Sequence, residues 1–499
     1  MDIKTLKFHE DTKLKTQVLV IGSGAGGSST ALMLAEAGYD VIIIEEGDYF
    51  QKADFAQPVP ALIETLYRDS ALTPILGRPN IAYGEGKCLG GSTVINGAIF
   101  RRPPESLLDY WEKKYGLSDV NGPSMDARFR RLENDLNASF QPQRNANKGS
   151  WRLVDAAEKL GWQSELLPRA QNACRNSNRC PTGCPNDAKQ SMLVSYLPRV
   201  SELGVRVICN TKADRLVREG NRVTGVETIV QNEDKCYRLS ISAESVFVCC
   251  GPMQTPAFLQ RNGFGGRIGK TLQLHLNLRA IAVFETGFKP AFGTIMSAAV
   301  TEFSNKGIHI GTSNFDLPYL AASLAPQTVS VAEHVIQNWA NSGMFVAQIK
   351  AQGRGEIRNS LLMGKTAAHY SINASDIELI RFTIIQTSKL LFEAGAKEIY
   401  FPITHSGPIR SLRNAIELAE SLSDPKTLHL VSVHAMSSCA MGVSSEAAIN
   451  QFGQVQQVEN LYINDASMLP EATSVNPQMS IMAMAIRNCE AFIDKSESR

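Results

Sequence analysis

Two side chains near the C-terminal end of the chain have the chemistry of a proton-transfer pair. His434 lies in the segment HAMSSCAMG, and Asn476 lies at the turn SVNPQ, which precedes a stretch rich in Met and Ala. A neutral imidazole can accept a proton near neutral pH, and a side-chain amide can hold and orient an oxygen atom. Because a single histidine is more often a hydrogen-bonded core residue than a catalyst, the pair gains meaning only from its surroundings.

A β-α-β unit with a nucleotide-binding fingerprint lies at the other end of the chain. The β-branched run 18–21 leads into GSGAGG and a helical stretch, and a second apolar run ends in Glu45. In this motif Gly22 permits the tight turn, Gly24 lets the backbone approach a pyrophosphate, and Gly27 lets the helix pack closely on the strand. An acid at Glu45 is placed to bond a free ribose 2′-hydroxyl, which favours NAD or FAD over NADP.

Two further segments extend the predicted nucleotide site. A second glycine-rich segment, 83–97, can let a flavin ring and a diphosphate lie against bare backbone. Near the C-terminal end, the run 461–464 reads as a short strand that ends in Asp465 and Ala466. Because these segments are far apart in the sequence, the nucleotide-binding domain is predicted to be discontinuous.

Three of the ten cysteines, Cys174, Cys180 and Cys184, form a cluster with the spacing C-x5-C-x3-C. Three interpretations remain open. A disulfide plus a free thiol fits poorly with a cytoplasmic chain, and zinc would want a fourth ligand that is not obvious nearby. A three-iron cluster would need only these three thiolates. The other cysteines are scattered, mostly in apolar surroundings, and are predicted to be small buried hydrophobes.

The composition limits the partners and the compartment. The net charge of +1 and the pI near 7.5 give no reason to expect nucleic acid or an anionic membrane surface as a partner. No apolar run approaches the roughly 20 residues of a membrane span. The polar start of the chain does not resemble a secretory signal, so we expect a cytoplasmic protein. Export together with a signal-bearing partner subunit is the alternative.

The pattern of elements predicts a mixed α/β fold with a Rossmann-like FAD-binding domain and a second domain for the substrate. The FAD-binding domain is assigned to residues 14–115, 190–270 and 425–499. The range 271–424 is predicted to form an antiparallel sheet that roofs the flavin, and the range 116–189 is an insert that carries the cysteine cluster.

Over most of its length the chain resembles the glucose-methanol-choline (GMC) family of FAD-dependent oxidoreductases. The motifs appear in the family's order: GSGAGG with Glu45, GKCLGGSTVINGAIFRRP, VFVCCGPMQTPAFLQRNG, HAMSSCAMG and LYINDASMLPEATSVNPQMSIMAMA. The resemblance implies that His434 faces the flavin as the catalytic base and that Asn476 holds the substrate oxygen. An alcohol would then lose a hydride to the flavin N5 atom and become an aldehyde or ketone. His275 lies where the family often has a histidine, and we expect it to be structural.

The resemblance also predicts how FAD is bound. Ile95 occupies the place at which some members carry the histidine that attaches the flavin, so non-covalent FAD is expected. The residues expected to contact the cofactor are Gly22, Gly24, Gly27, Glu45, Gly86, Gly90, Gly91, Ser92, Asn96, Gly97, Gly251, Asp465, Ala466, Pro477 and Gln478.

Within the family, the electron acceptor and the substrate stay open. The cysteine segment is similar to the iron–sulfur segment of gluconate and fructose dehydrogenase catalytic subunits. That similarity implies a [3Fe-4S] cluster, a sugar or sugar-acid substrate and a small redox partner subunit. The run GCPNDAKQSM also resembles long-chain fatty alcohol oxidases, for which O₂ is the acceptor. The many apolar residues of 271–424 favour an apolar or bulky alcohol. The remote alternative is a lyase, because the same fold hosts cyanohydrin cleavage.

Overall fold

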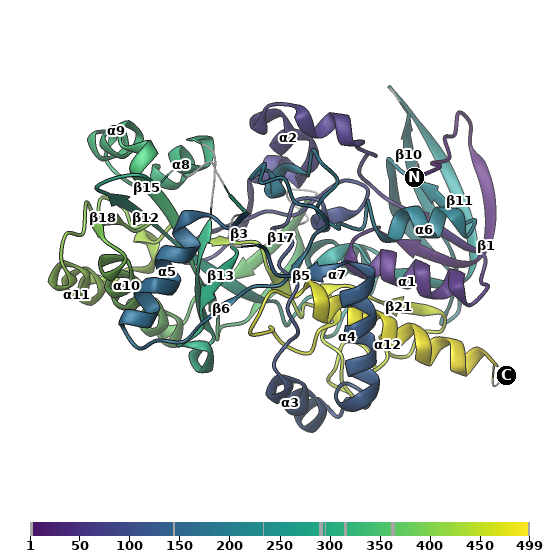
Figure 1. Cartoon of the computed structure of the whole chain (residues 1–499). Coiled ribbons are helices and arrows are strands. Elements are labelled where there is room, and N and C mark those ends of the chain that lie inside the picture. Colours follow the sequence, from purple (N-terminus) through teal and green to yellow (C-terminus); the bar gives the residue numbers. More distant parts are fainter. Residues whose placement is uncertain are drawn as a thin grey trace.

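The computed structural model describes residues 3–142, 145–232, 234–288, 293–294, 296–313, 317–360 and 365–497. These residues form two large sheets with helices packed on them, and a separate two-stranded sheet of β5 (Ala138–Ser139) and β7 (Arg169–Ala170). Figure 1 shows the two large sheets side by side. The smaller sheet lies with both chain ends on the right of the view, and the larger sheet extends from the centre to the left. The predicted α/β class is confirmed.

The smaller sheet holds the nucleotide-binding motif. Its parallel part has the order β8-β2-β1-β11, and β21 pairs with the end of β11. These strands are β1 (Thr12–Ile21), β2 (Val41–Ile44), β8 (Arg206–Ile208), β11 (Lys235–Val248) and β21 (Leu461–Ile463). The apolar run 18–21 of β1 is buried on both faces, as expected for a central parallel strand. Segments from both ends and the middle of the chain therefore build one sheet.

Helices cover this sheet, and an antiparallel ribbon extends it. Helix α1 (Ala25–Glu36) connects β1 to β2, and helix α12 (Gln478–Glu497) packs against α1. Strands β9 (Thr211–Glu219) and β10 (Arg222–Asn232) run antiparallel beside the first half of β11. The apolar side chains of these elements form one continuous core, which holds the glycine turn after β1 in place.

The larger sheet has the order β16-β17-β3-β4-β19-β12-β15-β14-β13-β6, with β18 and β20 also pairing to β12. Most neighbours are antiparallel; β3 with β17 and β4 with β19 are parallel. The strands are β3 (Thr73–Leu76), β4 (Ile81–Tyr83), β6 (Ser164–Leu166), β12 (Gln273–Phe284), β13 (Ala298–Val300), β14 (Ile308–Ser313), β15 (Ser342–Lys350), β16 (Gly355–Ser360), β17 (Lys365–Tyr370), β18 (Ala396–Tyr400), β19 (Val431–Ser432) and β20 (Ala435–Met436).

The two faces of the larger sheet differ in character. Leu274, Leu276 and Leu278 of β12 point into a core that includes side chains of helices α5 (Lys148–Lys159) and α10 (Ala374–Glu393). Because successive side chains of a strand point to opposite faces, His275 and Asn277 lie on the other face. The apolar residues of the predicted substrate domain are thus largely used in its own core.

Each of the three predicted domains contributes strands to the larger sheet, although the described residues of the range 190–270, part of the FAD-binding domain, contribute none. Strands β3 and β4 come from 14–115, β6 comes from the insert 116–189, and β19 and β20 come from 425–499. The domain borders stay a prediction. The remaining α-helices are α2 (Val59–Leu66), α3 (Glu105–Tyr115), α4 (Gly122–Asp135), α6 (Tyr196–Glu202), α7 (Gly251–Arg261), α8 (Leu317–Leu324), α9 (Val329–Gln337) and α11 (Leu412–Ser421).

Helix length and hydropathy bear on the membrane question. Among the described residues, none of the helices is both long enough and apolar enough to cross a bilayer.

Candidate active site

The three glycines of the fingerprint meet different surroundings. At Gly22, where φ is +101°, a Cβ atom would lie 2.4 Å from the carbonyl oxygen of Cys249, and at Gly27 it would lie 1.9 Å from the carbonyl oxygen of Gly22. At Gly24, which precedes helix α1, a Cβ atom would meet nothing within 4 Å. Gly22 and Gly27 are therefore required by close packing, and Gly24 leaves open space where a pyrophosphate could approach.

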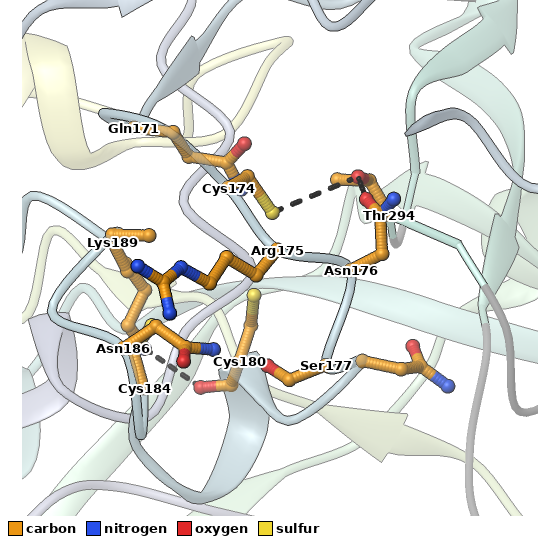
Figure 2. A pocket seen from close by; sticks show the side chains of 12 residues that line it. Gln171, Cys174, Arg175, Asn176, Ser177, Cys180, Cys184, Asn186, Lys189 and Thr294 are labelled. Carbon is orange, nitrogen blue, oxygen red and sulfur yellow. Dashed lines mark hydrogen bonds between the residues drawn. The ribbon is translucent and has the colours of Figure 1, made fainter. Parts of the chain in front are cut away.

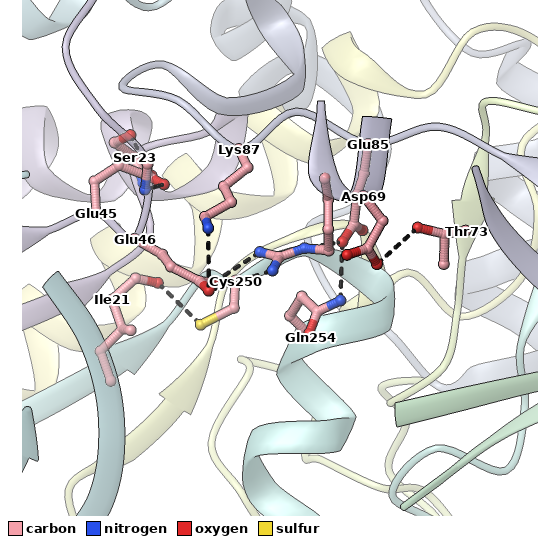
Figure 3. A network of polar contacts seen from close by, with 12 residues as sticks. Ile21, Ser23, Glu45, Glu46, Asp69, Thr73, Glu85, Lys87, Cys250 and Gln254 are labelled. Carbon is pink, nitrogen blue, oxygen red and sulfur yellow. Dashed lines mark hydrogen bonds and ion pairs between the residues drawn. The ribbon is translucent and has the colours of Figure 1, made fainter. Parts of the chain in front are cut away.

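Glu45 ends strand β2 beside this turn. Its buried carboxylate accepts hydrogen bonds from the backbone N–H of Ser23 (3.0 Å), the hydroxyl of Ser23 (2.6 Å) and the backbone N–H of Gly47 (2.9 Å), as Figure 3 shows in part. Burial raises the pKa of the Glu45 carboxyl, and the bonds from Ser23 and Gly47 oppose that shift. The carboxylate thus fixes the fingerprint turn. Its contact with a ribose hydroxyl stays a prediction.

Next to Glu45, an ion-pair network that the sequence did not reveal joins three segments. The guanidinium of Arg68 lies 2.7 Å from the Glu46 carboxylate and 2.6 Å from the Glu85 carboxylate, and Gln254 of α7 donates to Glu85 at 2.9 Å. Figure 3 shows this network beside Ser23 and Glu45. Burial alone would lower the pKa of Arg68, but the two carboxylates raise it. The network ties β2, α7 and the second glycine-rich segment together.

The second glycine-rich segment packs on the first. The backbone N–H of Gly90 donates to the hydroxyl of Ser23 at 2.9 Å, and a Cβ atom at Gly91 would lie 3.0 Å from the Cα atom of Gly24. Within the segment, the hydroxyl of Ser92 accepts from the N–H of Gly86 at 2.9 Å. The structure thus brings together glycines that lie far apart in the sequence, as the predicted FAD site requires.

Asn96 and Gly97 connect this segment to the last helix. The Nδ2 atom of Asn96 donates to Oε1 of Gln478, the first residue of α12, at 2.6 Å. A Cβ atom at Gly97 would meet nothing within 4 Å, so the backbone there faces open space. Pro477 lies directly before α12, where its fixed φ suits the helix start.

Asp465 fixes the third segment of the predicted cofactor site. Its buried carboxylate accepts from the backbone N–H of Gly251 at 2.9 Å and from the N–H of Ser467 at 2.7 Å. Burial raises the pKa of Asp465, and these hydrogen bonds oppose the shift. The next residue, Ala466, accepts from the N–H of Ser437 at 2.9 Å, which links this segment to the loop after His434. The start of helix α7 is therefore held beside β21.

The structure brings the predicted catalytic pair together and adds a third residue. His434 lies between β19 and β20, and its Nε2 atom is 3.5 Å from Nδ2 of Asn476. Its Nδ1 atom is 3.1 Å from Nδ1 of His275. The Nε2 atom of His275 is 2.6 Å from the carbonyl oxygen of Thr473. A chain of polar contacts therefore runs from Thr473 through both imidazoles to Asn476.

This chain determines where the protons lie. Burial lowers the pKa of His275 to about 4, and burial together with His275 lowers the pKa of His434 to about 3, so both rings are neutral at pH 7. A carbonyl oxygen only accepts, so the proton of His275 lies on Nε2 and faces Thr473. The Nδ1 atom of His275 is then an acceptor, and His434 donates to it from Nδ1. The Nε2 atom of His434 then carries a lone pair, which faces Nδ2 of Asn476 at 3.5 Å and can accept a proton.

The three clustered cysteines line one pocket (Figure 2), together with Lys189 and Thr294. The Sγ atom of Cys180 lies 3.7 Å from the guanidinium of Arg169, and the Sγ atom of Cys174 lies 3.9 Å from the hydroxyl of Thr294. All three thiols, including that of Cys184, are free. Burial raises the pKa of the Cys180 thiol, although Arg169 and Lys189 oppose this shift. The three cysteines of the sequence cluster therefore line the same pocket.

The arrangement of the thiols does not support the predicted iron–sulfur site. Within the described part of the chain, no three Cys, His, Asp or Glu side chains are grouped so that they could hold a metal ion. Instead, the buried ammonium group of Lys189 donates to the carbonyl oxygens of Cys180 (2.7 Å), Asn96 (3.1 Å) and Val94. Burial lowers the pKa of Lys189 to about 8. Lys189 therefore joins the cysteine loop to the second glycine-rich segment.

Comparisons with known proteins are consistent with this geometry. Two family models described as GMC oxidoreductase match residues 63–277 and 352–485, and a model of an FAD binding domain matches residues 17–58. An uncharacterised GMC-type oxidoreductase of Sinorhizobium fredii is 34% identical over 495 residues, which cover 98% of this chain and 97% of that protein.

A more distant relative and a solved structure extend the comparison. A long-chain-alcohol oxidase of Arabidopsis thaliana is 24% identical over 97% of this chain and 68% of its own length. The crystal structure of pyridoxine 4-oxidase from Mesorbium loti superposes with a TM-score of 0.73 at 15% identity, covering 96% of this chain and 99% of that one. At that identity the structural likeness concerns the fold alone.

Proposed function

The chain belongs to the GMC oxidoreductase family of FAD-dependent enzymes, and we propose on that premise that it oxidises an alcohol to an aldehyde or ketone with His434 as the base. The observation that carries the proposal is the contact chain from Thr473 through His275 to His434, which turns the Nε2 lone pair of His434 toward Nδ2 of Asn476, 3.5 Å away. This contact is long for a hydrogen bond, so a substrate hydroxyl can replace it.

The two side chains divide the work on the substrate hydroxyl. Asn476 donates a hydrogen bond from Nδ2 to the hydroxyl oxygen and thereby orients the carbon–hydrogen bond. His434 accepts the hydroxyl proton at Nε2, which lies 3.5 Å from that Nδ2 atom, so one oxygen can contact both groups. Bound FAD supplies the acceptor for the hydride that leaves the carbon. The alcohol loses one proton and one hydride and becomes a carbonyl compound.

His275 acts through His434 as a positioning residue. By accepting the Nδ1 proton of His434 it selects the tautomer whose Nε2 atom is basic. When His434 becomes positively charged, the same hydrogen bond strengthens because its donor is then ionised. This role replaces the purely structural one that we expected for His275 from the sequence.

Three backbone sites support the proposed mode of FAD binding. A side chain at Gly24, Gly97 or Gly251 would meet no atom of the protein within 4 Å, so the backbone is open to a ligand at each. We propose that the other predicted contacts shape this site from the segments around Glu45, Ser92, Asp465 and Gln478. The buried Ile95 cannot form a covalent link to a flavin, which supports non-covalent binding.

We favour O₂ as the electron acceptor over a redox partner subunit. The alternative of an iron–sulfur dehydrogenase needs Cys174, Cys180 and Cys184 as thiolate ligands. Their present arrangement does not form such a site, and burial favours the neutral thiol of Cys180. The relatives named as long-chain-alcohol oxidases support oxidase chemistry in this branch of the family.

Anaerobic titration of the FAD-loaded enzyme with a panel of alcohols tests the proposal. We expect at least one alcohol to bleach the visible flavin absorbance, and readmission of air to restore it with formation of peroxide. If a cyanohydrin is cleaved with no change in the flavin spectrum, and no alcohol bleaches the flavin, the lyase alternative replaces the proposal.

A further inference from the structure

Three polar side chains form a row across the larger sheet. His309 of β14 lies directly opposite Gln348 of β15, and Gln348 lies directly opposite Asn277 of β12. Only 7%, 6% and 8% of these residues, respectively, is exposed. Residues opposite one another in antiparallel strands point to the same face of a sheet. We call His309, Gln348 and Asn277 the polar row.

The polar row faces the reaction site. Asn277 is two residues from His275 along β12, so both side chains share the face on which His275 contacts His434, about 7 Å apart along the strand. At the other end of the row, the ring of His309 faces the backbone of Ser474, two residues before Asn476. The row therefore lies beside the loop that carries Asn476.

A neighbouring ion pair confirms this orientation. Lys350 lies opposite His275 in the register of β12 and β15, and it is two residues from Gln348. Its ammonium group is 3.0 Å from the carboxylate of Glu471, which belongs to the same loop as Asn476. The sheet face that carries the polar row is thus turned toward residues 471–476.

The polar row has few partners within the protein. In the part of the chain that the structure describes, the side chains of Asn277 and Gln348 form no hydrogen bond. Neither ring nitrogen of the buried His309 has a hydrogen-bond partner in the described part of the chain, although the ring faces the backbone of Ser474. Buried polar groups are nearly always hydrogen-bonded, because leaving them unpaired is unfavourable. Of the three, only His309 has polar atoms that are both fully enclosed and without a partner among the described residues, so the unpaired amide ends of Asn277 and Gln348 are not fully enclosed. Together these three groups beside the reaction site can bind a polar ligand.

The chemistry of the row narrows the class of that occupant. Amides both donate and accept, as hydroxyl groups do, whereas an alkyl chain would leave them unpaired. Burial lowers the pKa of His309 to about 3, so its ring is neutral at pH 7. Of the cations around the row, Arg101 is paired with the carboxylate of Glu165 and Lys350 with that of Glu471. Arg279 donates to the hydroxyl of Ser323 at 3.1 Å. The three members of the row itself are neutral hydrogen-bonding groups.

We propose that the polar row binds the additional hydroxyl groups of the substrate, and that the substrate is a polyhydroxylated alcohol such as a cyclic polyol or a sugar. This inference rests on the proposed function and specifies its substrate class. It differs from the apolar alcohol that the composition favoured, because Leu274, Leu276 and Leu278 of β12 lie on the opposite face and fill the core.

Two apolar substitutions of similar size test the polar row. Gln348→Met and Asn277→Leu remove the hydrogen-bonding groups, and Gln352→Met makes the same chemical change at an exposed position beyond the same strand as a matched control. Flavin reduction is measured anaerobically with myo-inositol, D-glucose, gluconate, cyclohexanol and 1-decanol. Binding of the same compounds to the FAD-loaded His434→Ala variant, alone and combined with Gln348→Met, is measured by calorimetry.

We expect a polyol or sugar to be the best substrate, by at least about 100-fold in kcat/KM over cyclohexanol. Gln348→Met and Asn277→Leu should each reduce kcat/KM for the polyol by about 3- to 10-fold. Neither variant should change kcat/KM for cyclohexanol, and the Gln352→Met control should have the wild-type kcat/KM for both substrates. A preference for 1-decanol or gluconate, with no loss in the two variants, would overturn the inference while the proposed function stands. If no alcohol reduces the flavin, the proposed function fails. In that case calorimetry tests the polar row by itself. If the row binds hydroxyl groups, the polyol must bind more weakly to His434→Ala combined with Gln348→Met than to His434→Ala alone.

Discussion

Replacing His275 by leucine is predicted to slow alcohol oxidation without removing the catalytic base. The substitution deletes the Nδ1 acceptor that lies 3.1 Å from Nδ1 of His434, so His434 is free to place its proton on either nitrogen. A hydrogen bond from a charged donor contributes about 1.5–3 kcal/mol, and His434 becomes charged as it accepts the substrate proton. Since about 1.4 kcal/mol corresponds to a factor of ten, flavin reduction should slow by about 10- to 100-fold.

The assay is stopped-flow reduction of the FAD-loaded enzyme by its best alcohol, measured across pH. His275→Asn is the matched control, because its Oδ1 atom retains an acceptor near the position of Nδ1 while the contact with Thr473 is lost. We expect His275→Asn to stay within about threefold of the wild-type rate. FAD content and melting temperature are measured for both variants, so that a loss of folding is recognised.

A role of His275 in packing alone would give a different pattern. Both variants would then slow the reaction equally, or neither would, and the pH profile would keep its shape. If the alcohol reduces the flavin of His275→Leu at the wild-type rate, the proposed tautomer of His434 is refuted. In that case the lone pair on Nε2 of His434 does not depend on the contact at 3.1 Å.

Three further predictions concern the cofactor, the acid stability and the cysteines. Gly24→Val should weaken FAD binding by more than about tenfold and leave the melting temperature of the cofactor-free protein unchanged, because a Cβ atom there meets only open space; unchanged flavin content would refute this. The free energy of unfolding should decrease as pH falls from 6.5 to 4, and His275 should account for up to about 1.4 kcal/mol per pH unit, because its imidazole is protonated at a higher pH in the unfolded state than in the folded state. Urea titrations would contradict this prediction if the unfolding free energy of His275→Asn depends on pH as steeply as that of the wild type. Iron and sulfide analysis of anaerobically purified protein should find iron well below stoichiometric amounts, whereas about three irons per chain would show that the cysteine loop rearranges around a cluster.

The nucleotide-binding part could be predicted from the sequence because its signals are local. The strand, the glycines and the terminal acid of the fingerprint follow one another within one β-α-β unit, and the structure packs Gly22 and Gly27 closely while Gly24 faces open space. The contact of Gly24 with a pyrophosphate stays a prediction. The pairing of His434 with Asn476 was predicted from the resemblance to the family, and the two side chains do lie together.

The remaining features depend on contacts that sequence patterns do not specify. The role of His275 follows from the direction of one ring nitrogen toward Thr473, and the polar row follows from the register of three strands. Arg68 reaches its two carboxylates only because separate segments meet in the fold. The cysteine spacing left an iron–sulfur site open, but the ability to bind a metal depends on the conformation of the loop between the cysteines.

The most direct test of the account is the rate of flavin reduction in His434→Ala. The variant is compared under anaerobic conditions with the wild type and with His429→Ala, which removes an exposed histidine away from Asn476. We predict that His434→Ala retains FAD and is reduced by alcohol at least about 10²-fold more slowly, whereas His429→Ala behaves like the wild type. Reduction of His434→Ala at the wild-type rate would contradict the assignment of His434 as the base.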